Sequence, residues 1–227
     1  AAQVIRDVYA KKGEANVIFA SSPSQLNLFD ALIKEEIDWG KVNVFHMDEY
    51  IGISTEEPAS FGNYVREHLL KYLSPKCVYY LNGLARDIYA ECDRYARLLT
   101  DHPVDVTFAG IGENGHMAFN DPYIADFFDP KLVKINECLD DACRCQQVND
   151  HWFTSIDQVP EKALTLTFPA LLRAPFLIIT VPGFSKRKII KEVLEGPIGL
   201  DVPSTCARLH RNAVLFIDDA SAQLLDV

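Results

Sequence analysis

The sequence predicts an α/β fold in which a mostly parallel sheet is covered by helices on both faces. Short apolar runs alternate along the chain with amphipathic stretches of helical spacing, which is the pattern of a buried parallel sheet between layers of helices. No long linker rich in Pro, Gly or Ser interrupts the series, and no internal repeat is evident. A length of 227 residues fits one large domain. We therefore expect residues 1–227 to form a single three-layer α/β/α domain.

The predicted strands are short apolar runs, in chain order 17–20, 42–46, 77–81, 104–109, 164–167, 176–181 and 214–217. Between them, apolar residues recur with helical spacing in 25–33, 61–72, 87–99 and 186–194. The chain opens inside a further predicted helix, 1–12, which Gly13 closes, so we expect residues ahead of it to be missing from this numbering. Residues 123–157 are the least regular part, and we expect them to include a mobile flap over a ligand site.

Composition and charge exclude several classes of function. With 48% hydrophobic and 24% charged residues, the chain has the composition of a globular protein. Its net charge of −10 argues against a nucleic-acid or anionic-membrane binder, and an anionic small substrate would need a locally basic pocket. The longest apolar run, 176–181, is too short to cross a bilayer, and no signal peptide is evident. We expect a cytoplasmic protein.

Six cysteines are scattered through the chain. A chain of this size does not need disulfides for stability, so reduced thiols in a cytoplasm are expected. Cys143 and Cys145 lie near His151, but this spacing fits no common zinc pattern. We expect no metal site.

The most informative segment is the glycine-rich stretch 110–122, which reads GIGENGHMAFNDP and follows the apolar run 104–109. Glycines allow a tight turn and a close approach of the backbone to a ligand. Loops that leave the carboxyl ends of strands line the ligand crevice of an open α/β sheet. His116 is a candidate proton shuttle there, with Asp121 or Asn114 fixing the orientation of its ring. The alternative is a structural histidine beside a turn.

Asp48 and Glu49 directly follow the apolar run 42–46, which places a carboxylate at the same edge of the sheet. Apolar neighbours would raise the pKa of Asp48, and this suits a base that moves a proton on and off carbon. The alternative is an aspartate that caps a helix.

Two more loops between a strand and a helix carry polar groups. Ser21, Ser22 and Ser24 precede a predicted helix, where hydroxyls and backbone amides can hold a phosphate, although Ser24 can equally be an N-cap. Lys186 lies close to another helix start, where a cation opposes the helix dipole. A phosphate shared with that helix would remove the conflict. Arg144 is a second candidate cation, with a solvated helix face as its alternative.

Taken together, these segments resemble the glucosamine-6-phosphate deaminase (isomerase) family, which is related to the 6-phosphogluconolactonases. The resemblance covers most of the chain and is carried by 45–52 (FHMDEYIG), 110–122, 159–165 (VPEKALT) and Ser185-Lys186 followed by Glu195-Gly196. It implies a modified Rossmann-like α/β/α fold and no redox cofactor. The implied reaction converts glucosamine 6-phosphate and water to fructose 6-phosphate and ammonia.

The resemblance also implies residue roles. Asp48 matches the base that carries a proton between carbon 2 and carbon 1, and His116 matches the residue that assists opening of the pyranose ring. Asn114 and Asp121 stand where the family usually has an aspartate and a glutamate. The substrate- and phosphate-binding candidates are Ser21, Ser22, Ser24, Glu49, Gly112, Arg144 and Lys186.

Two departures from the family pattern change what we expect of phosphate binding and of oligomeric state. Ser22 and Pro23 replace the usual glycine pair of the phosphate turn, and proline removes one amide donor. The chain also ends without the longer tail of the hexameric, allosterically regulated members, so we expect a monomer or small homo-oligomer without that regulation.

Three alternatives remain open: a deaminase of the galactosamine epimer, a 6-phosphogluconolactonase, and a regulator that binds a sugar phosphate without turnover. Asn114 and the altered phosphate turn motivate the regulator. The lactonase family has a Ser-Leu-Phe-Pro-type run after its histidine, whereas this chain has Ala118 to Pro122, which favours the deaminase. In each case the expected partner is a small-molecule sugar phosphate, not a nucleic acid or a membrane.

Overall fold

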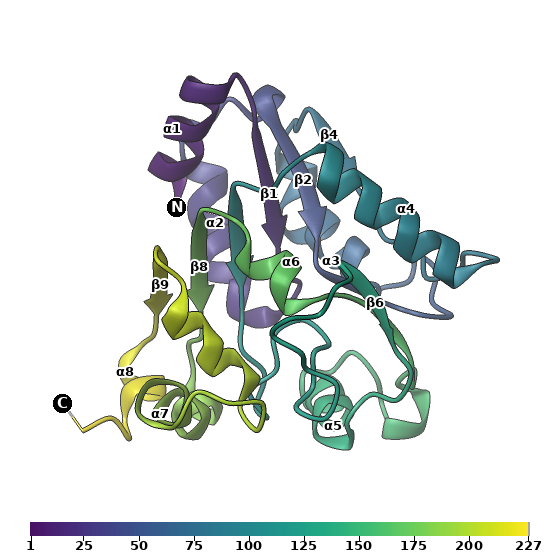
Figure 1. Cartoon of the computed structure of the whole chain (residues 1–227), viewed down its shortest axis with the longest axis vertical. Helices are drawn as coiled ribbons and strands as arrows, with labels where there is room; N and C mark the ends of the chain where they lie inside the picture. The colour runs from purple at the N-terminus through teal and green to yellow at the C-terminus, as the bar shows by residue number, and fades with distance from the viewer. Residues whose placement is uncertain (227) are drawn as a thin grey trace.

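The computed structural model describes residues 1–226, which form a six-stranded sheet with helices on both faces (Figure 1). The strands are β1 (Ala15–Phe19), β2 (Val42–His46), β4 (Cys77–Tyr79), β5 (Val106–Ala109), β8 (Phe176–Thr180) and β9 (Ala213–Phe216). Their order is β4-β2-β1-β5-β8-β9, and every neighbouring pair is parallel. Both faces of the sheet are covered, which is why its central strands are continuous apolar runs. The predicted mostly parallel sheet is confirmed.

The two faces of the sheet are covered by different helices. One face carries α1 (Ala2–Lys12), α2 (Leu26–Lys34) and α3 (Phe61–His68), and the other carries α4 (Ile88–Asp101), α6 (Phe168–Leu172) and α7 (Arg187–Glu195). Alternate side chains of a strand point to opposite faces: Phe19 of β1 packs with Phe29 of α2, whereas Ile18 lies in the cluster of Tyr95 and Ile190. The three-layer α/β/α arrangement is therefore as predicted.

A second, antiparallel sheet was not predicted. Its strands are β3 (Asp48–Tyr50), β6 (Val133–Asn136) and β7 (Ala163–Leu166), in the order β3-β7-β6. The apolar run 164–167 is a strand, as the sequence indicates, but it pairs here and not in the parallel sheet. β3 leaves the main sheet one residue after β2, and its Asp48 lies opposite Thr165 of β7. The second sheet thus fixes the direction of the chain immediately after β2.

The remaining helices lie mostly around the carboxyl ends of the strands. They are α5 (Asp141–Asn149), α8 (Asp219–Ala222) and the 3₁₀ turns η1 (Pro23–Gln25), η2 (Trp39–Lys41), η3 (Leu70–Tyr72), η4 (Ile156–Gln158), η5 (Phe184–Lys186) and η6 (Pro203–Leu209). α5 falls in the stretch that the sequence leaves irregular, and Asp140 caps it by accepting a hydrogen bond from the Ala142 N–H at 2.7 Å. Figure 1 shows α5 and α7 below the strand ends, on opposite sides. Within residues 1–226, no helix is long and apolar enough to span a membrane.

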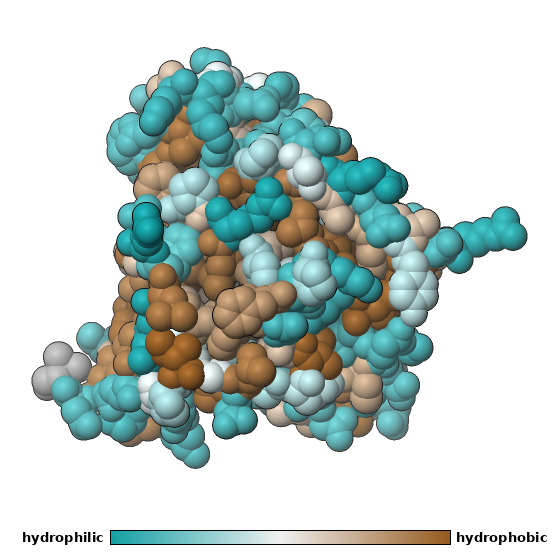
Figure 2. Space-filling view, viewed as in Figure 1, coloured by the Kyte–Doolittle hydropathy of each residue, from teal (hydrophilic) through white to brown (hydrophobic). Residues whose placement is uncertain are grey.

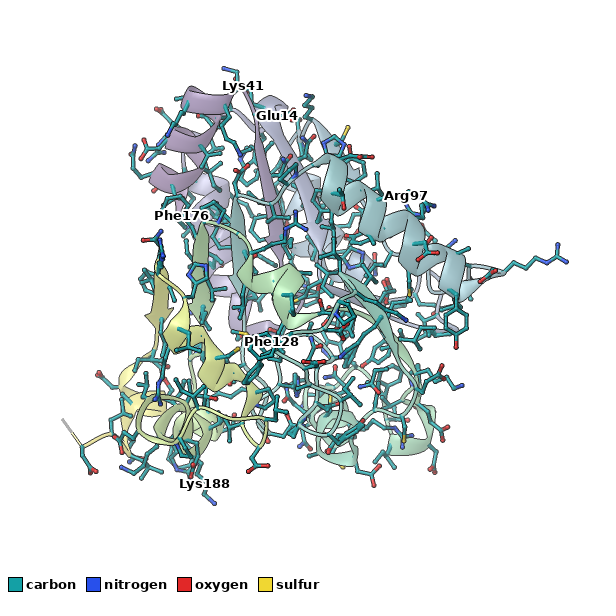
Figure 3. The ribbon with its side chains drawn as sticks, in the orientation of Figure 1. Glu14, Lys41, Arg97, Phe128, Phe176 and Lys188 are labelled. Carbon is teal, nitrogen blue, oxygen red and sulfur yellow. The ribbon has the colours of Figure 1, made fainter. Side chains whose placement is uncertain are left out.

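Most of the face shown in Figure 2 is hydrophilic, with apolar side chains gathered at its middle and lower left. Phe128, labelled near the middle of this face in Figure 3, is 89% exposed. Single exposed apolar side chains such as Phe128 are normal on a protein surface.

The strand order reverses between β1 and β5. From β1 the chain moves outward to β2 and β4, then returns to the other side of β1 as β5 and moves outward again to β8 and β9. The loops after β1 and β5 consequently run in opposite directions and leave a crevice between them. In open α/β sheets this crevice is where ligands bind.

Candidate active site

A cavity of about 330 Å³ lies at this reversal point, at the carboxyl ends of β1, β2, β5 and β8. Its walls come mainly from the loops that follow these four strands and from α5 with the turn after it, and Phe61 of α3 and Asp218 after β9 complete them. The polar groups that line it include Ser21, Ser22, Ser24, Asp48, Glu113, His116, Gln146, Gln147, Asp150, Ser185, Lys186 and Asp218. Residues distant in the sequence are therefore gathered by the ends of one sheet.

Asp48 reaches the cavity because the chain turns from β2 through Met47 into β3. The side chain is buried, and its Oδ1 atom has no hydrogen-bond partner within residues 1–226. Burial raises the pKa of Asp48 well above its ordinary value, and the neighbouring charge of Glu49 adds to the rise. A carboxylate in this state takes up a proton readily, as a general base must.

Glu49 points away from the cavity, because successive side chains of a strand alternate. Its carboxylate accepts hydrogen bonds from the Ser60 hydroxyl at 2.6 Å and from the N–H groups of Gly62 at 3.0 Å and Phe61 at 3.2 Å. These groups form the start of α3, and Glu49 is fully buried against them. Glu49, expected from the sequence to bind substrate, is therefore not among the residues that line the cavity, and its side chain anchors a helix N-terminus.

His116 lies over the backbone of Gly112, and only glycine leaves room for it. A Cβ atom at Gly112 would lie 2.0 Å from Cε1 of the imidazole. Nδ1 of His116 lies 2.5 Å from Oδ1 of Asn114, which also accepts the backbone N–H of His116 at 3.1 Å. An amide oxygen only accepts, so Nδ1 carries the proton. Nε2 is then the ring nitrogen available for acid–base chemistry.

Asp121 supports the histidine through Asn114, and we call it the orienting carboxylate. It is fully buried and accepts hydrogen bonds from Asn114 Nδ2 at 3.0 Å, Asn136 Nδ2 at 3.1 Å and the Asp140 N–H at 3.3 Å. Burial lowers the pKa of His116, and the charge of Asp121 opposes this shift. The structure thus brings together the three polar residues of the glycine loop in the order His116, Asn114, Asp121.

A corner of the cavity is suited to an anion. Ser21, Ser22 and Ser24 line it, the hydroxyls of Ser22 and Ser24 lie 2.7 Å apart, and the buried Ser21 hydroxyl has no partner among the described residues. Lys186 also lines the cavity and is only 8% exposed, whereas Lys188 points into solvent at the lower edge of the molecule (Figure 3). Burial lowers the pKa of Lys186. A partnerless hydroxyl and a buried cation are the groups that a phosphate would satisfy.

Arg144 does not join this corner. It lies on α5, but its guanidinium donates to the carbonyl oxygens of Ile156 at 2.9 Å and Val159 at 3.2 Å, on the side away from the cavity. Arg144, expected from the sequence to bind the phosphate, is therefore not among the residues that line the cavity, and its side chain ties α5 to the η4 turn.

Sequence reasoning missed the wall that α5 forms. Gln146, Gln147, Asp150 and Trp152 line the cavity from this helix and the turn after it. Trp152 holds the wall in place through an edge-to-face contact with Tyr64, with ring centroids 5.2 Å apart. The available signal was the adjacent amide pair Gln146-Gln147 in the segment that Asp140 caps.

One group of side chains within residues 1–226 has the composition of a metal site. Ligand atoms of His116, Asp121 and Cys143 lie within 4.8 Å of one another. However, three N–H donors already occupy the carboxylate of Asp121, and Asn114 occupies Nδ1 of His116. Burial also raises the pKa of the Cys143 thiol, which disfavours the thiolate that a metal requires. The arrangement is that of a hydrogen-bonded relay.

Comparison with known proteins agrees with this geometry. Residues 1–119 match the family described as glucosamine-6-phosphate isomerases/6-phosphogluconolactonase. The chain is 33% identical over 222 residues to a glucosamine-6-phosphate deaminase of Lactobacillus delbrueckii subsp. bulgaricus, covering 96% of this chain and 92% of the relative. It is 30% identical over 223 residues to the enzyme of the same name from Streptococcus pyogenes serotype M3, covering 98% and 92%.

Solved structures give the same result for the fold. A monomeric glucosamine-6-phosphate deaminase superposes with a TM-score of 0.88 at 29% identity, covering 99% of this chain and 93% of the other. A 6-phosphogluconolactonase from Thermotoga maritima superposes with a TM-score of 0.73 at 19% identity, covering 95% and 90%. The second similarity establishes a shared fold only.

Proposed function

The chain belongs to the glucosamine-6-phosphate isomerase/6-phosphogluconolactonase family, and we propose that it converts glucosamine 6-phosphate and water to fructose 6-phosphate and ammonia. The observation that carries this proposal is one cavity that holds a desolvated carboxylate, an oriented neutral imidazole and an anion-binding corner. The deaminase relatives cover nearly the whole chain, which supports the same reaction.

The anion-binding corner would hold the sugar phosphate. The serine hydroxyls supply hydrogen-bond donors, and Lys186 supplies the charge. Pro23 has no N–H, so the hydroxyls of Ser21, Ser22 and Ser24 carry a larger share of the binding than backbone amides would. Anchoring the phosphate places the other end of the sugar near Asp48 and His116.

His116 would open the pyranose ring. With Nδ1 protonated and held by Asn114, Nε2 can accept the proton of the hydroxyl on carbon 1 and deliver one to the ring oxygen as its bond to carbon 1 breaks. The lowered pKa of His116 keeps the imidazole neutral, so that it can act in both directions. The product of this step is the open-chain aldose.

Asp48 would then carry out the isomerisation. Its carboxylate removes the proton from carbon 2 and returns it to carbon 1, while the nitrogen gives up a proton and the aldehyde oxygen on carbon 1 gains one. Carbon 1 thereby becomes an alcohol, and carbon 2 forms a double bond to the nitrogen. Water adds to carbon 2, and the carbon–nitrogen bond breaks. The oxygen of water becomes the ketone oxygen and the nitrogen leaves as ammonia. The raised pKa of Asp48 suits a base that must take a proton from carbon.

We also propose that the protein acts in the cytoplasm as a monomer or small homo-oligomer. The six cysteines, all within the described residues, are free thiols, which fits a reducing compartment. The deaminase of known structure that the chain resembles is described as monomeric.

Ammonia release from glucosamine 6-phosphate tests the function, with galactosamine 6-phosphate and 6-phosphogluconolactone as parallel substrates. We expect ammonia and the ketose phosphate from glucosamine 6-phosphate, and no faster hydrolysis of the lactone than occurs without protein. Folded protein that releases no ammonia from either amino sugar would refute the proposal. Faster turnover of the galactosamine epimer would reassign the substrate within the same reaction.

The Asp48→Asn variant tests the assignment of the base. We expect exchange of the carbon 2 proton with solvent to fall by roughly 10²–10⁴-fold, the usual contribution of a general base. Asp101→Asn, which alters an exposed carboxylate at the end of α4, is the matched control and should keep the parental rate. Exchange at the parental rate in Asp48→Asn would show that another group is the base.

A further inference from the structure

The cavity is acidic although its proposed ligand is a phosphate. Among the Lys and Arg residues of the described chain, only Lys186 lines it, whereas Asp48, Glu113, Asp150 and Asp218 all do. A ligand with no charge other than its phosphate would meet excess negative charge in this cavity. A 2-amino sugar phosphate also carries an ammonium group, which one of these carboxylates could receive.

Three of the four carboxylates are otherwise engaged or exposed. Asp48 is the proposed base. Asp218 accepts the N–H groups of Gly183 at 3.0 Å and Ser221 at 2.8 Å, so its oxygens hold the loop after β8. Glu113 is exposed at the rim of the cavity. This leaves Asp150 as the carboxylate without a structural task.

Asp150 is half-buried and poorly satisfied. Within residues 1–226, one hydrogen bond reaches its carboxylate, from Gln146 Nε2 at 3.5 Å, which is long for such a bond. Burial raises the pKa of Asp150, whereas the charge of Lys186 opposes the rise. A partly desolvated carboxylate that lacks donors is stabilised by a cation that brings its own N–H groups.

The backbone around Asp150 is fixed, so its direction into the cavity is built into the fold. Its N–H donates to the Gln146 carbonyl at 2.8 Å, and the Trp152 N–H donates to the Gln147 carbonyl at 3.1 Å. His151 between them adopts a left-handed backbone with φ 64°, which is uncommon for a residue other than glycine. The turn therefore holds a carboxylate against the open cavity.

The position of Asp150 on its helix also favours a cation. Asp150 is the residue that follows the last turn of α5, where the helix dipole places partial negative charge. An acidic side chain is unfavourable there, because it adds to that charge. A bound ammonium group would offset both the side chain and the helix end.

We propose that Asp150 binds the nitrogen of the substrate: the ammonium group on carbon 2 in the forward reaction, and free ammonium when the reaction runs in reverse. This inference rests on the proposed deamination. In the hydrolysis of the carbon–nitrogen bond, water supplies the ketone oxygen. The nitrogen departs with the bonding electron pair and takes up a proton, and the resulting ammonium is released from Asp150.

The reverse reaction separates this role from phosphate binding, because fructose 6-phosphate and ammonium are then two independent substrates. For Asp150→Asn we expect the KM for ammonium to rise by roughly 10- to 100-fold, the worth of one charge-assisted hydrogen bond. The KM for fructose 6-phosphate should remain at the parental value. Asp150→Glu, which restores the charge, should recover part of the ammonium affinity.

Asp157→Asn is the matched control, because Asp157 is exposed on η4 and does not line the cavity. An unchanged KM for ammonium in folded Asp150→Asn would overturn the inference. So would a lowered KM for fructose 6-phosphate alone, since Asp150 would then act by repelling phosphate. Parental protein that neither releases nor incorporates ammonia would instead refute the proposed function, so the two failures are distinguishable. If Asp150→Asn does not fold, Asp150→Glu decides: a raised KM for ammonium with a parental KM for fructose 6-phosphate supports the role, and an unchanged KM for ammonium or a loss of fructose 6-phosphate affinity alone contradicts it.

Discussion

The substitution Gly112→Ala tests the packing of the catalytic loop. The new Cβ atom would lie 2.0 Å from Cε1 of His116 and 2.3 Å from both ring nitrogens. Carbon atoms in contact are about 3.5–4.0 Å apart, so the imidazole must move by roughly 1.5 Å. The 2.5 Å contact between Nδ1 and Asn114 cannot survive such a movement.

The expected consequence is a loss of ring opening without a loss of the base. Displacement of a catalytic group by about 1 Å can cost 10²-fold in rate, and removal of a general acid–base group costs about 10²–10⁴-fold. We therefore expect kcat for deamination of glucosamine 6-phosphate to fall by roughly 10²–10⁴-fold. Incorporation of solvent deuterium at carbon 1 of fructose 6-phosphate, measured with ammonium present, should fall much less, because the proton transfer by Asp48 precedes ring closure.

Gly199→Ala is the matched control, because a Cβ atom there would meet nothing within 4 Å. This variant should keep both rates. If Gly112→Ala also kept the parental kcat, the imidazole would not need the position seen here, and the assignment of ring opening to His116 would fail. Equal losses in deamination and deuterium incorporation would show that the substitution disturbs the whole cavity.

Three further predictions follow from the same contacts. The acid limb of the kcat/KM pH profile should have its midpoint above 3.8, the ordinary pKa of a carboxyl group, because Asp48 must be ionised and burial raises its pKa. The alkaline limb should have its midpoint below 10.5, the ordinary pKa of lysine, because burial lowers the pKa of Lys186 and the neutral amine binds phosphate poorly. An acid limb at the ordinary carboxyl value would contradict this. Tyr95→Phe leaves the buried His46 N–H without its acceptor at 3.1 Å and should destabilise the fold by about 1–3 kcal/mol, lowering Tm by ~2–4 °C per kcal/mol, which calorimetry would measure. Asn114→Asp places a second carboxylate against the orienting carboxylate. Because two like charges repel, we expect lower thermal stability at neutral pH and a recovery of stability at acidic pH. Equal stability at neutral and acidic pH would argue against the relay.

The sequence predicts the parallel sheet well because burial on both faces makes each central strand an apolar run. It does not predict β3, since Asp48–Tyr50 is a three-residue segment with two carboxylates. Its strand conformation comes from pairing with β7, a segment more than a hundred residues later in the chain. Local propensity carries no information about such a distant partner.

The same limit separates the site residues whose position follows from the topology from those whose position does not. His116 and Asp48 each follow a strand closely, so the topology fixes the end of the sheet at which they lie. Arg144 and Asp150 belong to α5, and the direction of their side chains depends on where that helix docks. The docking turns Arg144 toward the carbonyl oxygens of η4 and leaves Asp150 at the cavity. Residue type alone would instead place Arg144 at the cavity and Asp150 away from it, because a phosphate attracts arginine.

Two unfavourable helix ends meet at the cavity, and one ligand relieves both. α7 begins with Lys186 at its N-cap and has no acidic residue in its first turn, whereas α5 ends with Asp150. Each charge has the wrong sign for its helix terminus, and both side chains are partly or fully removed from water. A phosphate at Lys186 and an ammonium group at Asp150 would reverse both conflicts at once. A sugar that carries both groups is therefore a better match to this cavity than a phosphorylated lactone, which offers only the first.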